Sequence, residues 1–118
     1  MEGTGNQLIT GQCHCGTIKY EAQGPILRQG TCTCRACQRA TGTLKSPNIG
    51  VAPKNLKITA GAITEFQAES NEACDSGIWN LCNQCGSQLF WMNGSRTELA
   101  IFAGTLDNTS LFRTEDEP

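Results

Sequence analysis

The chain has 118 residues, of which 38% are hydrophobic and seven are aromatic, so its length fits one small domain with a modest core. Its formal net charge of −2 argues against nucleic acid as the main partner, because such domains usually carry a strongly basic face. No stretch approaches the roughly 20 apolar residues of a membrane-spanning helix, and the first residues do not resemble a secretory signal. We therefore expect a single domain over residues 1–118 in a reducing compartment such as the cytoplasm, with no membrane and no nucleic-acid partner.

Short segments between frequent glycines and prolines predict a mainly β protein. Along the chain, the first clear strand is Thr17 to Glu21, where Ile18 and Tyr20 alternate with polar residues. One short helix is expected at Arg35 to Thr41, ended by Gly42, because glycine commonly follows the last helical residue. Further strands are expected at Leu56 to Thr59, Ile63 to Ala68, Ser87 to Met92 and Leu99 to Ala103.

Seven of the eight cysteines fall into three tight clusters. Cys13 and Cys15 form a C-x-C-G motif, Cys32, Cys34 and Cys37 form a C-x-C-x-x-C motif, and Cys82 and Cys85 form a C-x-x-C-G motif. Four thiolates can close a tetrahedral zinc site, whereas three leave one position for water or substrate. The pattern therefore predicts two zinc sites, one structural and one reactive.

Two of the clusters repeat each other, since each is a cysteine pair followed at once by a glycine, Gly16 or Gly86, and then by a strand-like segment. Glycine in that position permits a positive φ, so that neighbouring amides can point at the thiolates. We expect these two knuckles to be the halves of one closed site. A metal there would join distant parts of the chain and close a long loop.

The three-cysteine cluster is expected where a strand, ending around Thr31 to Cys34, enters the short helix. Cys34 and Cys37 are three residues apart and share a helical face, and Cys32 precedes them on the strand, so the three sulfurs can converge. No fourth ligand is evident nearby. We expect His14 near the surface and Cys74 to be a bystander in a loop, although either residue could complete the site and make it a second structural zinc.

A disulfide framework is the main alternative to zinc, because eight cysteines could form four bridges. Bridging Cys13 to Cys15, or Cys32 to Cys34, would close a strained miniature ring. Clustered cysteines in a reducing compartment are also more often metal ligands than cystines. Both arguments favour zinc.

Four segments of the chain carry a family resemblance: GQCHCGTIKYE from Gly11, CTCRACQRATG from Cys32, CNQCGSQLFW from Cys82, and AGTLD from Ala103. Together they resemble the glutathione-dependent formaldehyde-activating enzyme family, which includes relatives of centromere protein V. The resemblance implies a β-tent fold of small stacked antiparallel sheets. It implies a structural zinc on Cys13, Cys15, Cys82 and Cys85, and a second zinc on Cys32, Cys34 and Cys37. The family reaction joins glutathione and formaldehyde to give S-hydroxymethylglutathione.

The expected function is a zinc-dependent carbon–sulfur lyase or synthase that acts on glutathione, or a similar thiol, and a small aldehyde. Its catalytic zinc would be held by Cys32, Cys34 and Cys37. Arg35 and Arg39, four residues apart on the short helix, could bind substrate carboxylates or be solvated surface charges. Two other functions stay open: a non-catalytic zinc-stapled binding module, and a sensor of thiols or metals.

Overall fold

The structure, a computed structural model, describes residues 7–67 and 77–113; Ala68 and Cys74 lie outside these ranges. Two antiparallel sheets form the domain. The smaller sheet has the order β1 (Leu8–Gln12), β2 (Lys19–Gln23) and β5 (Leu56–Ala60). The larger sheet has the order β3 (Arg28–Cys32), β4 (Ser46–Val51), β9 (Leu99–Phe102), β8 (Gln88–Met92), β7 (Ile78–Leu81) and β6 (Thr64–Gln67). The expectation of a mainly β fold with stacked antiparallel sheets is confirmed.

The one α-helix of the described residues is α1 (Arg35–Thr41), with the predicted bounds. Gly42 follows it with φ 75°, and its N–H donates to the carbonyl of Gln38, so the helix ends as glycine usually ends one. Three short 3-10 helices complete the described elements: η1 (Pro53–Asn55), η3 (Ala103–Thr105) and η4 (Thr109–Leu111).

Several strand bounds differ from the prediction by one or two residues. The strand expected from Thr17 begins only at Lys19, because Ile18 completes the turn that holds the first cysteine pair. The strand expected to end near Cys34 ends at Cys32, and Cys34 is the extended residue that caps α1. The turn at the first cysteine pair therefore decides where β2 begins, and the start of α1 decides where β3 ends.

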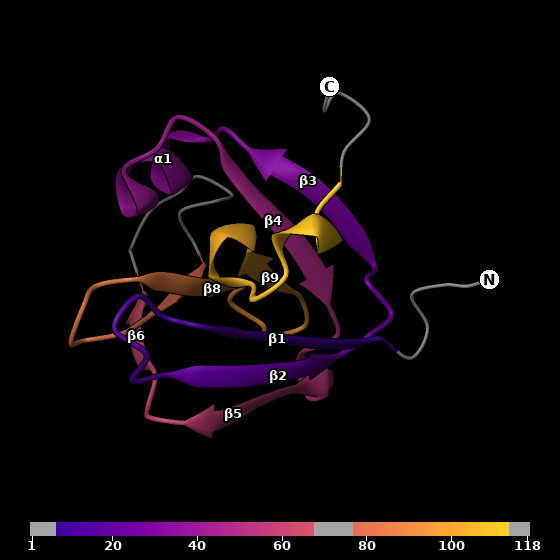
Figure 1. Cartoon of the computed structure of the whole chain (residues 1–118). Helices are drawn as coiled ribbons and strands as arrows, with labels where there is room; N and C mark the ends of the chain where they lie inside the picture. The colour runs from indigo at the N-terminus through magenta and orange to yellow at the C-terminus, as the bar shows by residue number, and fades with distance from the viewer. Residues whose placement is uncertain (1–6, 68–76, 114–118) are drawn as a thin grey trace.

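The main core lies between the two sheets (Figure 1). Along β9, Leu99 and Ile101 point into it, whereas Ala100 and Phe102 point to the opposite face, as the two-residue period of a strand requires. The core residues that are less than 2% exposed are Ile9, Cys13, Ile18, Tyr20, Ala22, Ile49, Val51, Cys82, Leu89, Phe90, Leu99 and Ile101.

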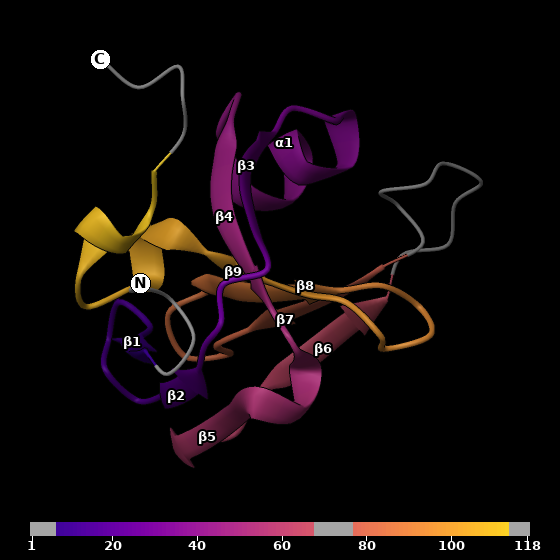
Figure 2. The same ribbon diagram turned by 90° about the vertical axis from the view of Figure 1, so that its right-hand side faces the viewer.

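The second face of the larger sheet carries α1, on the side away from the smaller sheet (Figures 1 and 2). Cys37 from the helix packs there against Trp79 and Phe102, whose rings stack with centroids 6.3 Å apart. The larger sheet is thus sandwiched between a three-stranded sheet and a single short helix. Among the described residues, no helix is long and apolar enough to cross a membrane.

The AGTLD segment, Ala103–Asp107, docks on β1. Its backbone approaches Gly11 so closely that a Cβ on Gly11 would lie 2.4 Å from the carbonyl oxygen of Thr105. Asp107 bonds to Thr10 twice, with its backbone N–H donating to the Thr10 carbonyl and its carboxylate accepting from the Thr10 hydroxyl at 2.8 Å. This motif therefore locks the end of the larger sheet onto the edge of the smaller one.

Candidate metal centres

Four cysteines come together from two turns that are far apart in sequence. Cys13 and Cys15 lie in the turn between β1 and β2, and Cys82 and Cys85 lie in the turn between β7 and β8. Their sulfurs all lie within 4.8 Å of one another. Because β1 and β2 belong to the smaller sheet and β7 and β8 to the larger one, this cluster joins the two sheets.

The two turns have the same internal construction. Gly16 and Gly86 each have φ 81°, and each donates its backbone N–H to the carbonyl of the first cysteine of its pair. The thiols of Cys13 and Cys82 also each accept a backbone N–H at 3.3 Å, from Ile18 and Gln84 respectively. The sequence prediction of two matching knuckles, with a positive-φ glycine and amides directed at sulfur, is confirmed.

Those hydrogen bonds favour negative charge on sulfur. The Ser87 side chain, together with the backbone N–H groups of Ser87 and Cys15, lowers the pKa of the Cys85 thiol to about 5. Burial raises the pKa of Cys13, but hydrogen bonds from Ile18 and Cys15 outweigh it, so the net shift is downward. A backbone hydrogen bond from Cys85 lowers the pKa of the Cys82 thiol, but burial and the neighbouring thiols of Cys13 and Cys85 outweigh it, so its net shift is upward. Cys13 and Cys85 are therefore the thiols that hydrogen bonding favours for ionisation.

The spacing of these sulfurs suits a tetrahedral zinc. Zinc–thiolate bonds of about 2.3 Å place two sulfurs of a tetrahedron about 3.8 Å apart. The separations are 3.7 Å between the sulfurs of Cys13 and Cys15, and 3.8 Å between those of Cys15 and Cys82. Donor chemistry and geometry both fit a closed, structural zinc site.

The three remaining clustered cysteines lie at the junction of β3 and α1. Cys32 is the last residue of β3, Cys34 precedes the helix, and Cys37 lies within it. The Cys32 sulfur is 3.3 Å from that of Cys34 and 2.9 Å from that of Cys37. The convergence predicted from the sequence is confirmed, and these three residues form the second candidate metal group.

This cluster differs electrostatically from the first. Burial raises the pKa of the Cys37 thiol well above its ordinary value, and the neighbouring sulfurs of Cys32 and Cys34 raise it further. A divalent cation would reverse that effect by neutralising three converging thiolates. An all-sulfur donor set suits zinc, although the sulfurs would have to move apart by about half an ångström to one ångström to reach tetrahedral separations.

Other sequence expectations can be checked at both clusters. All seven clustered cysteines are free of disulfide bonds, which removes the cystine framework for the described residues. His14 is exposed and belongs to neither metal group, as expected. Within residues 7–67 and 77–113, no His, Cys, Asp or Glu joins Cys32, Cys34 and Cys37 as a fourth ligand.

A cavity of about 150 Å³ opens beside the three-cysteine cluster. Cys32 and Cys37 line it together with Arg28, Asn48, Trp91, Ala100 and Phe102. It is smaller than the roughly 300 Å³ at which pockets for drug-sized ligands begin, so it suits one arm of a ligand rather than a whole tripeptide. Neither Arg35 nor Arg39 lines this cavity; both are exposed, and Arg35 donates to Gln38 at 2.6 Å.

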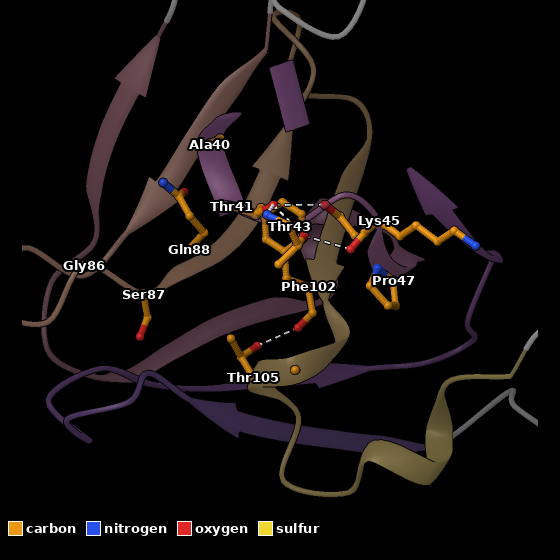
Figure 3. Close-up of a pocket in the computed structure, with 12 residues that line it drawn as sticks. Ala40, Thr41, Thr43, Lys45, Pro47, Gly86, Ser87, Gln88, Phe102 and Thr105 are labelled. Atoms are coloured by element: carbon orange, nitrogen blue, oxygen red, sulfur yellow. Dashed lines mark hydrogen bonds between the residues drawn. The ribbon is translucent and has the colours of Figure 1, made fainter. Parts of the chain in front are cut away.

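A larger cavity of about 380 Å³ lies on the other side of Phe102, between the end of α1 and the second knuckle (Figure 3). No cysteine of residues 7–67 and 77–113 lines it. Its threonine hydroxyls bond to the protein itself: Thr41 donates to the Cys37 carbonyl, Thr43 to the Lys45 carbonyl and Thr105 to the Phe102 carbonyl. Figure 3 shows the Lys45 side chain extending away from Ser87 and Gln88. Its threonine hydroxyls are thus already bonded within the protein, and the two cysteines of the three-cysteine cluster that line a cavity, Cys32 and Cys37, line the smaller one.

Arg28 and Asn48 are the lining residues that sequence reasoning missed. Arg28 begins a strand with no apolar alternation, RQGTC, and Asn48 lies in a strand, SPNIGV, that contains both proline and glycine. Neither segment carries a strong strand signal, so nothing local directs these side chains toward the cysteines. Only the pairing of β3 with β4 brings them there.

Comparisons with known proteins agree with this arrangement. The sequence profile described as "Glutathione-dependent formaldehyde-activating enzyme" matches residues 8–117. A crystal structure of a Rhodobacter sphaeroides protein, a structural genomics target, superposes with a TM-score of 0.66 at 22% identity, covering 84% of this chain and 88% of that one. At that identity the likeness concerns the fold alone. No curated protein matches the chain.

Proposed function

The chain belongs to the glutathione-dependent formaldehyde-activating enzyme family, and from that premise we propose that it is a zinc-dependent carbon–sulfur lyase or synthase. Its substrates would be glutathione, or a similar thiol, and a small aldehyde such as formaldehyde. One observation carries the proposal: three converging thiols have no fourth described ligand, and two of them line a cavity. The reduced thiols that the proposal needs fit a reducing compartment such as the cytoplasm.

The reaction would be an addition to the carbonyl group. A sulfur–carbon bond forms, the electron pair of the C=O π bond moves to oxygen, and the thiol proton ends on that oxygen. No oxidant or reductant is needed. Zinc held by Cys32, Cys34 and Cys37 would supply positive charge that lowers the pKa of an incoming thiol, although three thiolates leave the site at −1 and weaken its action on a carbonyl.

The residues of the cavity would shape the site around the reacting atoms. Trp91 and Phe102 give aromatic walls, Ala100 leaves room between them, and Asn48 is a neutral polar group on the wall. Apart from the cysteines, no lining side chain titrates near neutral pH. The proton that leaves sulfur would therefore reach oxygen through solvent rather than through a general base of the protein.

The proposal is tested by exchange NMR with ¹³C-formaldehyde and glutathione. The zinc-loaded protein is expected to accelerate exchange between free formaldehyde and the hydroxymethyl thioether, and Cys34→Ser is expected to abolish that acceleration with the fold intact. X-ray absorption should show three sulfurs and one lighter ligand at one zinc. Equal exchange rates with and without Cys34 would contradict the proposal.

A thiol or metal sensor is the second candidate, favoured by the 2.9 Å separation of the Cys32 and Cys37 sulfurs. A peroxide could take two electrons and two protons from this pair and leave a sulfur–sulfur bond. A reactive-thiol titration separates the two functions. A sensor would release zinc and lose two titratable thiols at low peroxide, whereas the enzyme would keep both while it turns over.

A further inference from the structure

One row of residues across the larger sheet contains three that line the small cavity: Arg28, Ala100 and Trp91. Arg28 in β3 is paired with Gly50 in β4, Gly50 with Ala100 in β9, and Ala100 with Trp91 in β8. Directly opposed residues point to the same face of a sheet. Two small residues, Gly50 and Ala100, therefore lie between Arg28 and Trp91 in the row, which leaves room above the sheet for the guanidinium.

The side chain of Arg28 lies across Gly50. Its Cγ and guanidinium atoms are 2.9–3.2 Å from where a Cβ of residue 50 would be, so only glycine leaves this path open. The nearest described acid is Glu98, at 3.7 Å, and both side chains are about half exposed. A long, exposed ion pair of this kind contributes little, so a ligand carboxylate can compete for Arg28.

The cavity thus has a sulfur end and a cationic end. Cys32 is four residues from Arg28 on the same extended strand, which separates their Cα atoms by about 13 Å along the strand. The Arg28 guanidinium lies over Gly50, the residue paired with Arg28, so it does not reach along the strand and the two ends stay about that far apart. An extended dipeptide spans about 7 Å. A thiolate–metal bond of about 2.3 Å and a charge-assisted hydrogen bond of about 2.8 Å bring the total to about 12 Å. The span suits a carboxylate separated from sulfur by peptide length and is too long for a two-carbon thiol acid.

We propose that Arg28 forms a carboxylate subsite that selects thiols whose carboxylate lies about a dipeptide's length from the sulfur. The proposal rests on the proposed function for the place of the sulfur. Arg28 would bind the carboxylate through paired N–H donors, which match carboxylate geometry. In this assignment Arg28, rather than Arg35 or Arg39, distinguishes one thiol from another.

The test is calorimetric binding of two probes to the zinc-loaded protein, glutathione and its glycine monoethyl ester, which lacks the charged carboxylate at that end. Glutathione is expected to bind about tenfold more tightly than the ester. Arg28→Met should reduce the affinity for glutathione to that for the ester and leave the affinity for the ester unchanged. Arg28→Lys should restore part of the difference between the two affinities. The matched control is Arg39→Met, an exposed arginine outside the cavity, which should change neither affinity.

A second variant moves binding in the opposite direction. Glu98→Gln removes the competing carboxylate, so it should tighten glutathione binding and leave the ester unaffected, which keeps the test informative if Arg28→Met fails to fold. Equal affinity of wild-type protein for the two probes, or absence of binding by both, would overturn the subsite. Discrimination between the probes without catalysed exchange would contradict the proposed function and leave the subsite standing.

Discussion

The two cysteine clusters present the same ligand atom, a cysteine sulfur, with different spacing and in different surroundings. The four-cysteine cluster is built from turns that donate backbone N–H groups to sulfur, and its sulfur separations of 3.7 and 3.8 Å already suit zinc. In the three-cysteine cluster the sulfurs lie as close as 2.9 Å, and Cys37 is packed against aromatic rings. The first cluster already has the sulfur spacing of a tetrahedral zinc site, whereas the second would need a cation to separate and ionise its sulfurs.

We propose that this difference assigns separate tasks to the two sites. In this proposal the closed cluster between the two sheets stabilises the fold, whereas the cluster at the strand–helix junction, with a cavity beside it, binds a ligand. If that division is right, damage to the two sites should have unequal consequences for stability and for metal content.

The largest expected effect follows from Cys82→Ser. Cys82 is fully buried and its cluster joins the two sheets, so the variant should lose cooperative thermal unfolding. Structural zinc contributes about 10 kcal/mol or more to small zinc-stapled domains. Circular dichroism during heating, with elemental analysis of zinc, measures both properties.

The matched variant for this comparison is Cys34→Ser at the other cluster. It should keep a cooperative transition and about one zinc per chain, where the wild type holds about two. A wild-type melting temperature for Cys82→Ser, or unfolding of Cys34→Ser, would reverse the assignment of the structural and reactive sites.

The next prediction concerns the aromatic rings that pack against the three-cysteine cluster. Phe102→Ala removes a ring that stacks on Trp79 and contacts Cys37, and such truncations cost about 3–5 kcal/mol. The variant should release one zinc to a chelator sooner than wild type and retain the other. Leu44→Ala is the control, because Leu44 is 75% exposed and its truncation should change stability by less than about 0.5 kcal/mol.

Gly11→Ala tests the region around the closed cluster. An added methyl would lie 2.2 Å from the Tyr20 hydroxyl and 2.4 Å from the Thr105 carbonyl oxygen, so the AGTLD segment would have to move. The expected loss is about 3 kcal/mol in urea unfolding, the upper part of the usual range for overpacking. Gly104→Ala, in the same segment with no atom within 4 Å of the added carbon, should be near neutral. Equal losses in the two variants would show that this close approach is unimportant.

Sequence patterns were sufficient wherever the structure is decided by neighbours in the chain. The knuckles depend on two cysteines and a following glycine, and both were predictable with their backbone donors. The bounds of α1 were also predictable, because Gly42 ends the helix by adopting a left-handed conformation.

The cavity was not predictable, because it depends on strand register. β4 contains Pro47 and Gly50, which argue against a central strand, yet it pairs with both β3 and β9. Pairing with β9 begins only at Asn48, so the missing N–H of Pro47 lies outside that ladder. Gly50 is needed because Arg28 crosses it. No local signal connects residues 28 and 50.

The smallest expected effect concerns a hydrogen bond near the four-cysteine cluster, whose loss should lower stability without changing the zinc content. Tyr20, in β2 just after the first knuckle, shares a 2.7 Å hydrogen bond with Thr105, and burial raises its pKa to about 12 from 10. Tyr20→Phe should cost about 1 kcal/mol at pH 8 and leave both zinc sites filled. Since the folded state holds the phenol proton more tightly than the unfolded state, the contribution of Tyr20 is complete below pH 10 and is lost as the pH rises through 12. Urea unfolding at pH 8 and pH 11 should therefore show the difference between wild type and variant shrinking at pH 11; a constant difference would place the Tyr20 hydroxyl in a less buried environment than the structure gives it.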